Sequence, residues 1–431
     1  MNNKIKKTLK FIYNHLICGF VLINIAFVLL TSYFYVKQIS SYHNNSKLYI
    51  VFLVLNILMI IAHIIFKKLK KEPFNFKIYD LFFIFILAFS LLSAILSINT
   101  ESAFFGFKGR YEGFFQIMYY FSLFFLASFL NKNEKKIIAI AIMLSGLIEV
   151  IYAHFQVFKL FNVFVMYHHK KPWATGFVTN PNFFGSLSVL SLCIAISLFF
   201  DVEKKYLKTI LGVLIAILMS GLLISDTLSA LIGLIVAMMY LIFFAIKNKK
   251  IKLLIITIIV LAVMTGLQTG LGKTNLLKDL VKTKNQSIEI AKGNVKDNYG
   301  SNRMFIWKNT LKIVPDNLHY GVGIDNFYYA FGDKPLVMKG WFFDKAHNEY
   351  LQILICEGIH ALTAYLLFFG SIFLIGVKDS LKNKKLLFIL PVIAYLVQAF
   401  FNISVIEVSP FFYAFLGLCA TRDVTNRGFE K

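Results

Sequence analysis

Residues 48–71, LYIVFLVLNILMIIAHIIFKKLKK, contain the pattern that decides the fold: a long apolar run that ends in a cluster of lysines. A helix needs about 20 apolar residues to cross a bilayer. The pattern recurs along the 431-residue chain, of which 58% is hydrophobic, whereas soluble domains are about 45–50% apolar. The chain is therefore predicted to be an all-α polytopic integral membrane protein. Twelve candidate spans lie at 11–36, 48–66, 79–98, 114–130, 137–157, 183–200, 207–224, 226–246, 251–271, 347–376, 386–403 and 407–421.

The loops between these spans alternate between lysine-rich and lysine-poor. Because cytoplasmic loops carry the excess of lysine and arginine, the lysine-rich set, which includes both termini, is predicted to be cytoplasmic. The opposite set, 99–113, 158–182 and 272–346, then faces outward. We expect a multi-pass protein of the cytoplasmic (inner) membrane in three parts. Residues 1–271 hold spans one to nine, 272–346 form a long external loop between spans nine and ten, and 347–431 hold the last three spans and a cytoplasmic C-terminus.

The formal net charge of +23 could indicate nucleic-acid binding. The lysines lie in short loops between apolar runs, however, so membrane lipids are expected partners and nucleic acid is not. The four cysteines all fall within apolar runs, and the sequence has no Asp-x-Asp pair and no clustered Cys/His ligands. We therefore expect no metal and no cofactor. Residues 270–274 resemble the end of a P-loop, but Leu267 stands where that motif needs its first glycine.

Arginine is rare in this chain, with only Arg110, Arg303, Arg422 and Arg427 among 45 basic residues. Arg303 and Trp307 are four residues apart and would share one face of a short external helix. One interpretation is an interfacial helix, with tryptophan at the headgroups and arginine against anionic lipid. The other is a planar fork that binds a pyrophosphate and stabilises the charge that develops when it leaves.

His347 and Asn348 open the tenth predicted span. One interpretation is structural, in which Asp344 or Asn348 satisfies free N–H groups at the start of the helix. The other is a general base, because a histidine pKa near 6.5 suits proton removal from a hydroxyl near neutral pH. Counting back about 20 residues from Val377 reaches Glu357. The residues from His347 to Glu357 are thus expected to project above the bilayer as a continuation of the helix.

Further candidates lie in the other outward loops. Arg110 and Tyr111 fall in 99–113 and Lys171 in 158–182, where they form either an interfacial belt or a substrate-binding set with Tyr111 as a stacking surface for sugars. Glu357 is an ionisable residue in an apolar run, which makes it a functional candidate. The predicted substrate-binding residues are Arg110, Lys171, Trp307, Asn348, Tyr111 and Glu357, and the predicted catalytic residues are His347 and Arg303.

Short motifs follow one another in a fixed order through residues 300–358, and their combination resembles the O-antigen ligase and O-antigen polymerase family of membrane glycosyltransferases. These motifs are Arg303-x-x-x-Trp307, Pro315, Gly321-x-Gly323-x-x-Asn326-Phe327, Ala346-His347-Asn348-x-Tyr350-Leu351 and Glu357-Gly358. Gly176-Phe177-x-x-Asn180-Pro181-Asn182, before the sixth span, is similar to the same family. The twelve spans with a large external loop between the ninth and tenth also resemble it.

The resemblance implies a GT-C-like, metal-independent, inverting glycosyltransferase. Its donor would be a glycan on undecaprenyl pyrophosphate, and its acceptor a hydroxyl of a glycan, a lipid or a wall polymer. By position, His347 matches the external-loop histidine implied as the base, and Arg303 matches the arginine that binds the pyrophosphate. Many members carry another arginine just after the seventh span, where residues 225–230 of this chain, SDTLSA, have none; Arg110 or Lys171 is the candidate substitute.

The expected function is ligation or polymerisation of a surface polysaccharide on the outer face of the membrane. The alternative is a transporter or flippase of lipid-linked glycans with twelve spans. Such a protein would need charged or broken helices at mid-membrane and pseudo-symmetric halves. The predicted spans carry few central charges and the polar chemistry lies on one face, which favours the enzyme.

Overall fold

The computed structural model of the protein describes residues 3–37, 42–71, 75–161, 163–168, 171–332 and 334–420. Within these residues the chain is almost entirely helical, and its strands form two short antiparallel hairpins. Nine of the described helices are long and apolar enough to cross a membrane, and three shorter apolar helices accompany them. The fold is therefore that of an all-α, multi-pass membrane protein, and each of the twelve predicted spans corresponds to one of these helices.

Twelve of the described helices are apolar. They are α1 (Asn3–Val36), α2 (Tyr42–Leu69), α3 (Ile78–Ile95), α5 (Phe114–Ser128), α6 (Lys132–Phe158), α7 (Pro181–Asp201), α8 (Lys205–Ile224), α9 (Leu228–Lys247), α10 (Ile251–Gly270), α13 (Glu349–Asn383), α14 (Leu390–Ala399) and α15 (Ser409–Cys419). The remaining elements are α4 (Thr100–Phe105), α11 (Leu276–Ala291), α12 (Arg303–Ile313), the 3-10 turns η1 (Pro315–Asn317) and η2 (Phe327–Tyr329), and the hairpins β1 (Tyr167–His168) with β2 (Lys171–Pro172) and β3 (Leu336–Met338) with β4 (Trp341–Phe343).

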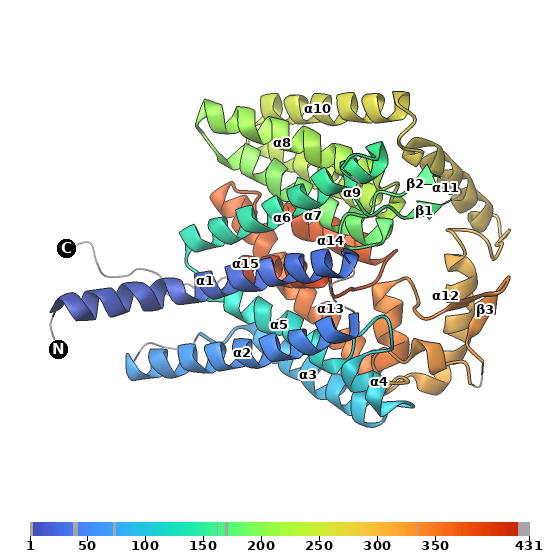
Figure 1. Ribbon diagram of the computed structural model, residues 1–431, viewed down its shortest axis with the longest axis horizontal. Helices are drawn as coiled ribbons and strands as arrows, with labels where there is room; N and C mark the ends of the chain where they lie inside the picture. The colour runs from blue at the N-terminus through green and yellow to red at the C-terminus, as the bar shows by residue number, and fades with distance from the viewer. Residues whose placement is uncertain are drawn as a thin grey trace.

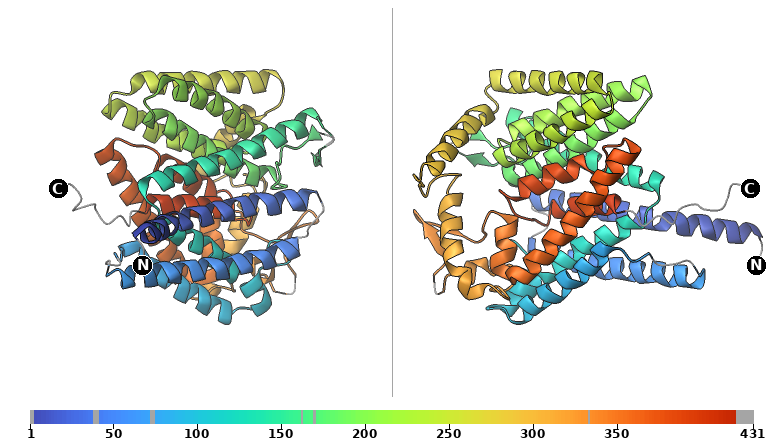
Figure 2. Two further views of the ribbon diagram at one scale, coloured as in Figure 1. Left: turned by 60° about the vertical axis from the view of Figure 1, so that its left-hand side comes forward. Right: turned by 180° about the vertical axis from the view of Figure 1, so that it is seen from behind.

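The apolar helices run roughly along the long axis of the molecule, and the polar elements gather at one end of it (Figure 1). The N-terminus lies at the opposite end. We call the end that holds α4, α11, α12 and both hairpins the distal end. Two further views show the same separation (Figure 2). All three loops predicted to face outward thus lie at one end of the bundle.

Helix α7 forms the centre of the bundle. Every residue of its apolar segment is buried, and it packs against α6, α8, α9 and α14. Small side chains let the neighbouring backbones approach closely. At Gly185, for example, a Cβ atom would lie 2.6 Å from the Thr227 side chain. At the other extreme α10 is mostly exposed, as expected of a helix that faces lipid.

Helix α13 is broken near the distal end of the bundle. Gly358 has φ +85° and ψ 176°, outside helical geometry, which interrupts the helical hydrogen bonds there. The carbonyls of Ile355 and Cys356 instead accept the N–H groups of Val322 (3.0 Å) and Gly323 (2.9 Å). On the far side of the break, the Ile359 N–H donates to the carbonyl of Leu318 at 2.7 Å. The segment 318–323 therefore satisfies backbone groups that the break would leave unpaired.

The glycines at this junction permit the close approach of the two backbones. A Cβ atom on Gly358 would lie 2.2 Å from the carbonyl oxygen of His319, and one on Gly321 would lie 2.3 Å from the carbonyl carbon of Cys356. The prediction that the residues from His347 onward continue the helix is therefore wrong in two respects. The helix begins at Glu349, and residues 349–357 form a short helical segment of their own, because backbone from residues 318–323 is inserted at Gly358.

We predict that Gly358→Ala lowers the stability of the protein by about 2 kcal/mol or more, because the new Cβ clashes with backbone and alanine is strained at positive φ. Thermal unfolding in detergent would show a lower apparent Tm. Gly370→Ala is the matched control, because that glycine lies in the same helix with no atom within 4 Å of its Cβ position. Equal melting temperatures for the two variants would contradict the account of the break.

Candidate functional site

The predicted catalytic residues lie at the distal end, on two segments that contact each other. Arg303 is the first residue of α12, and His347 lies in the loop just before α13. Trp307, one turn after Arg303, donates its indole N–H to the carbonyl oxygen of Ala346 at 3.0 Å. The helix that carries the arginine is thus tied by one hydrogen bond to the peptide group that precedes the histidine.

Arg303 is held by backbone carbonyls. Its Nε donates to the carbonyl oxygen of Phe401 at 3.0 Å, and one terminal nitrogen donates to that of Gly300 at 3.1 Å. No carboxylate forms an ion pair with this guanidinium among the residues that the structure describes. Burial lowers the pKa of Arg303 from its ordinary value, yet an arginine remains charged at any physiological pH. The remaining donors of the fork are therefore available to an anion.

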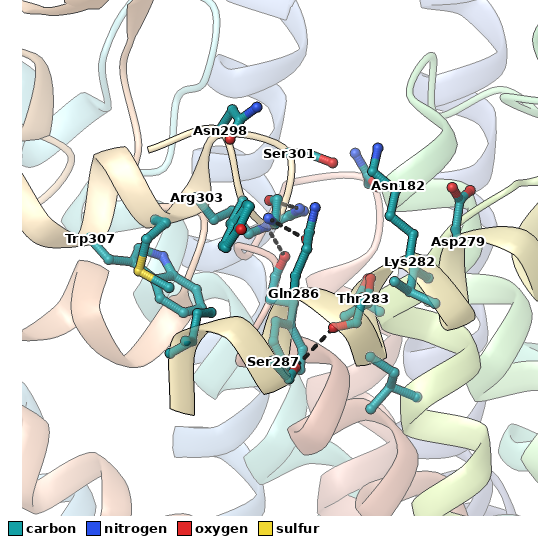
Figure 3. Close-up of a pocket in the computed structure, with 18 of the residues that line it drawn as sticks. Asn182, Asp279, Lys282, Thr283, Gln286, Ser287, Asn298, Ser301, Arg303 and Trp307 are labelled. Carbon is teal, nitrogen blue, oxygen red and sulfur yellow. Dashed lines mark hydrogen bonds between the residues drawn. The ribbon is translucent and has the colours of Figure 1, made fainter. Parts of the chain in front are cut away.

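A pocket of about 330 Å³ opens beside this arginine, between α9, α11 and α12. Figure 3 shows Arg303 and Trp307 on one side of it and Thr283, Gln286 and Ser287 of α11 on the other. The remaining polar side chains of the lining include Asn182, Asp226, Asp279, Lys282 and Asn298. The pocket is thus bordered by two cations, Arg303 and Lys282, and two carboxylates, Asp226 and Asp279, together with hydroxyl and amide groups.

Asp226 stands in the segment after the seventh predicted span, where the resemblance implied an arginine. Its carboxylate accepts hydrogen bonds from the Thr274 hydroxyl (2.8 Å) and the Asn275 N–H (2.7 Å). These bonds hold the start of α11, the helix that brings Lys282 to the pocket. In this chain the segment 225–230 therefore positions a neighbouring helix and contributes no guanidinium.

The residues on both sides of His347 are fixed. The Ala346 N–H donates to the Gln352 side chain at 2.8 Å, opposite the bond from Trp307. Asn348 caps α13, because its side-chain oxygen accepts the N–H of Leu351 at 3.0 Å. His347 itself has φ +49°, in the left-handed region that few non-glycine residues adopt. Its neighbours hold it in this conformation, and its ring makes no hydrogen bond to a described side chain.

The surroundings of His347 favour the neutral imidazole. Burial and the charges of Arg303 and Arg110 lower its pKa to about 4, although Asp344 acts in the opposite direction. Three of the predicted cationic or basic residues, Arg110, Arg303 and His347, are therefore close enough to interact electrostatically. At neutral pH His347 is an uncharged base within the electrostatic reach of two guanidinium groups.

Arg110 is paired, which the sequence did not indicate. Its Nε and a terminal nitrogen donate to the two carboxylate oxygens of Asp344 at 2.6 and 3.1 Å. Burial alone would raise the pKa of Asp344, but the hydrogen bonds and charge of Arg110 outweigh it and hold that pKa below its usual value. Such bidentate pairs are strong and geometrically specific. Arg110 therefore fixes the loop that leads to His347.

The other predicted substrate-binding residues have different surroundings. Tyr111 is half-buried with φ +57°. Glu357 is buried and accepts a hydrogen bond from the Ser90 hydroxyl, inside the contact between α13 and α3. The backbone of Lys171 lies in β2, but its side chain lies outside the part of the chain that the structure describes. Asn348, as noted, serves as a helix cap.

The structure also adds residues that the sequence reasoning did not select. They are Lys282 in the pocket, Asp344 and Gln352 around His347, and the buried pair Asp325 and Lys345. Asp344 and Lys345 directly precede the Ala346-His347-Asn348 motif. This position next to the motif was the only feature of the sequence that could have identified these two residues. Among the described residues, no group of three or more histidine, cysteine or acidic side chains is placed to hold a metal ion.

The fold and the site define a multi-pass membrane protein whose polar residues converge at one end of the helix bundle. Residues 211–366 match the family described as O-Antigen ligase. The matched region runs from α8 into α13 and contains both Arg303 and His347. This match covers less than half of the chain, and it supports the resemblance to the O-antigen ligase and O-antigen polymerase family. No curated protein matches the chain.

This assignment indicates a role in ligating or polymerising surface polysaccharide through a glycosyltransferase-like reaction. In general terms, its partners are a lipid-linked glycan and an acceptor.

We predict that His347 titrates near pH 4 in the folded protein. Diethyl pyrocarbonate reacts with neutral imidazole, so labelling of the His347 peptide, measured by mass spectrometry, should fall by half near that pH. Arg303→Met removes a charge that lowers the pKa, so the midpoint should rise. The denatured chain is the control, with a midpoint near the ordinary value of about 6.5. A folded-state midpoint at that value would refute the description of this site.

Proposed function

We propose that the protein transfers a glycan from an undecaprenyl-pyrophosphate donor to an acceptor hydroxyl on the outer face of the cytoplasmic membrane. Both termini are then cytoplasmic, and the distal end faces outward. The observation that carries the proposal is the convergence of an unpaired arginine beside an open pocket and a neutral histidine on an adjoining loop. The O-antigen ligase match supports the same class of reaction.

The donor's pyrophosphate would lie in the pocket beside Arg303. A planar guanidinium can donate two parallel hydrogen bonds to phosphate oxygens, and Lys282 adds a second positive charge at the pocket wall. Fixed donors of this kind stabilise the charge that develops on a leaving pyrophosphate and need no reorganisation during the reaction. In this role Lys282 takes the place that the sequence reasoning gave to Arg110 or Lys171.

His347 would act as the general base. The acceptor hydroxyl gives its proton to the free imidazole nitrogen while its oxygen attacks C1 of the donor sugar. The bond from C1 to the pyrophosphate oxygen breaks, and the lipid pyrophosphate leaves with the electron pair. Attack in line with this bond inverts the anomeric centre. A pKa of about 4 leaves His347 unprotonated at neutral pH, so it is ready to accept a proton, although a base this weak gains less from the transfer.

Ligase and polymerase reactions share this chemistry and differ in the acceptor, a lipid or wall molecule in one case and a growing glycan in the other. The proposed reaction is metal-independent, because Arg303 and Lys282 neutralise the leaving group. A gel of glycans from a deletion strain separates the two reactions. Loss of a polymerase leaves single repeat units, whereas loss of a ligase leaves a lipid-linked polymer.

We predict that His347→Ala lowers transfer from a lipid-pyrophosphate glycan in vitro by about 10²–10⁴-fold, the usual contribution of general base catalysis. His360→Ala is the control, because this exposed histidine at the start of the membrane-spanning part of α13 stacks on Phe89 and His319 and contacts the His319 ring nitrogen, away from the site residues. Wild-type transfer should be unchanged when a chelator is added. Near-normal products from His347→Ala would exclude it as the base, and chelator-sensitive activity would exclude the metal-free reaction.

We predict that Arg303→Lys lowers transfer by about tenfold or more, because an ammonium group keeps the charge and loses the two-pronged contact. The expected change is a weaker affinity for the donor together with a lower kcat, measured over a series of donor concentrations. Lys312→Met, an exposed residue of the same helix, is the control. If the lysine variant has full activity, Arg303 serves the membrane interface and does not bind phosphate.

A further inference from the structure

A buried ion pair lies beneath the candidate site. Asp325 is 2% exposed and Lys345 is 4% exposed, and their charged groups are in direct contact. The second carboxylate oxygen of Asp325 accepts the backbone N–H groups of Phe107 (2.6 Å) and Glu112 (3.0 Å). One aspartate therefore connects three segments that are far apart in the sequence: 106–112, 321–326 and 344–348.

Each connected segment leads to the site. Arg110 lies between Phe107 and Glu112, whose N–H groups both donate to Asp325. The loop that carries Arg110 is therefore held by Asp325 at both of its ends. Lys345 lies between Asp344, the partner of Arg110, and the Ala346 peptide that precedes His347. The ion pair thus sets the position of the Arg110 loop relative to the His347 loop.

Backbone strain is found in the same three segments. Tyr111, Asp325 and His347 all have positive φ, at 57°, 57° and 49°. Conformations of this kind are costly for residues other than glycine, and they persist where the surrounding structure determines them and where function requires them. A buried ion pair is likewise a poor way to gain stability, because apolar packing of the same volume often stabilises as much or more. Both observations are better explained by a need for defined geometry.

We propose that Asp325 and Lys345 are positioning residues, which hold the Arg110 loop and the His347 loop in register for transfer. This inference rests on the proposed function, since it concerns how His347 meets the acceptor. Neither residue touches the substrate in this account. They act through Arg110, Asp344 and His347.

Lys345 also contributes charge. The charged groups that face His347 are Arg303 from α12, Arg110 from the 106–112 loop, and its own neighbours Asp344 and Lys345. The positive charge of Lys345 lowers the pKa of His347, in addition to burial and the two arginines. Burial alone would lower the pKa of Lys345, but the charges of Asp325 and Glu112 outweigh it and raise that pKa. Lys345 therefore stays charged throughout the range in which His347 titrates.

The test uses the full-length protein and the double variant Asp325→Asn with Lys345→Met. A single substitution leaves a buried charge without its partner, which is strongly destabilising, whereas the double variant removes both charges together. We expect a folded protein with kcat about 10- to 100-fold lower and little change in KM for the donor, as loss of alignment between reacting groups requires. In a plot of kcat/KM against pH, the acid limb, where activity falls as His347 becomes protonated, should move to higher pH. The reason is that His347 binds a proton more readily without the charge of Lys345.

Controls separate positioning from general structure. The double variant Asp297→Asn with Lys308→Met removes an exposed ion pair of 3.7 Å beside α12, and it should leave rate and pH profile unchanged. Lys345→Arg keeps the charge and should keep the acid limb in place. The acid limb of the pH profile reports on His347, because burial raises the pKa of the nearby Glu112 to about 8, well above the pH range in which His347 titrates.

The outcomes distinguish this inference from the proposed function. If His347→Ala is inactive while the Asp325/Lys345 double variant has wild-type kcat and an unchanged acid limb, the pair has no positioning role and the function stands. If the wild-type protein transfers no glycan, the function fails. The pH midpoint of His347 labelling in the double variant then still tests whether the Asp325–Lys345 pair acts on His347. A midpoint equal to that of the wild type overturns the inference.

Discussion

The insertion of residues 318–323 at the break of α13 is the interaction on which the distal end depends. A membrane helix cannot leave backbone groups unpaired near the bilayer, because no water is present to satisfy them. Here the N–H groups of Val322 and Gly323 satisfy the carbonyls that Gly358 frees. The same contact attaches the polypeptide of the distal end to the helix bundle, close to Asp325 in the sequence and close to the first turns of α13. This contact, together with the bond from Trp307 to Ala346, holds the segment that carries Arg303 against the segment that carries His347.

Next to that junction, a few polar contacts position the residues of the site. Trp307 and Gln352 hold the two sides of the Ala346 peptide, and Arg110 with Asp344 fixes the segment just before it. The result is a histidine that forms no hydrogen bond of its own to a described side chain and that is kept neutral by the surrounding cations. In the proposed reaction a base and an anion-binding arginine have conflicting needs, since positive charge aids the leaving group and weakens the base. Asp344 moderates this conflict, because its charge opposes that of the arginines at His347.

The extent to which the sequence predicted this structure follows from the range of the interactions involved. The spans were predictable because the length of an apolar run is a local property, and each of the twelve predicted runs has its helix. Arg303, Trp307 and His347 were predictable from short motifs, although their roles await experiment. The break at Gly358 was not, because it depends on a segment 35 residues or more upstream. Asp325 was missed for the same reason: its importance comes from contacts with residues 107, 112 and 345, and nothing in its own neighbourhood of the sequence indicates them.

The loop between α14 and α15 has a consequence for the biogenesis of the protein. The Phe401 carbonyl accepts a hydrogen bond from Arg303, and the backbone and hydroxyl of Ser404 bind Glu349 at 2.6 and 2.7 Å. This loop leaves the ribosome after both Arg303 and His347. A nascent chain with ten spans already inserted has synthesised both residues, yet it lacks the contacts from Phe401 and Ser404 that support their segments. The order of synthesis therefore delays the assembly of this end of the bundle until α14 and α15 have been made.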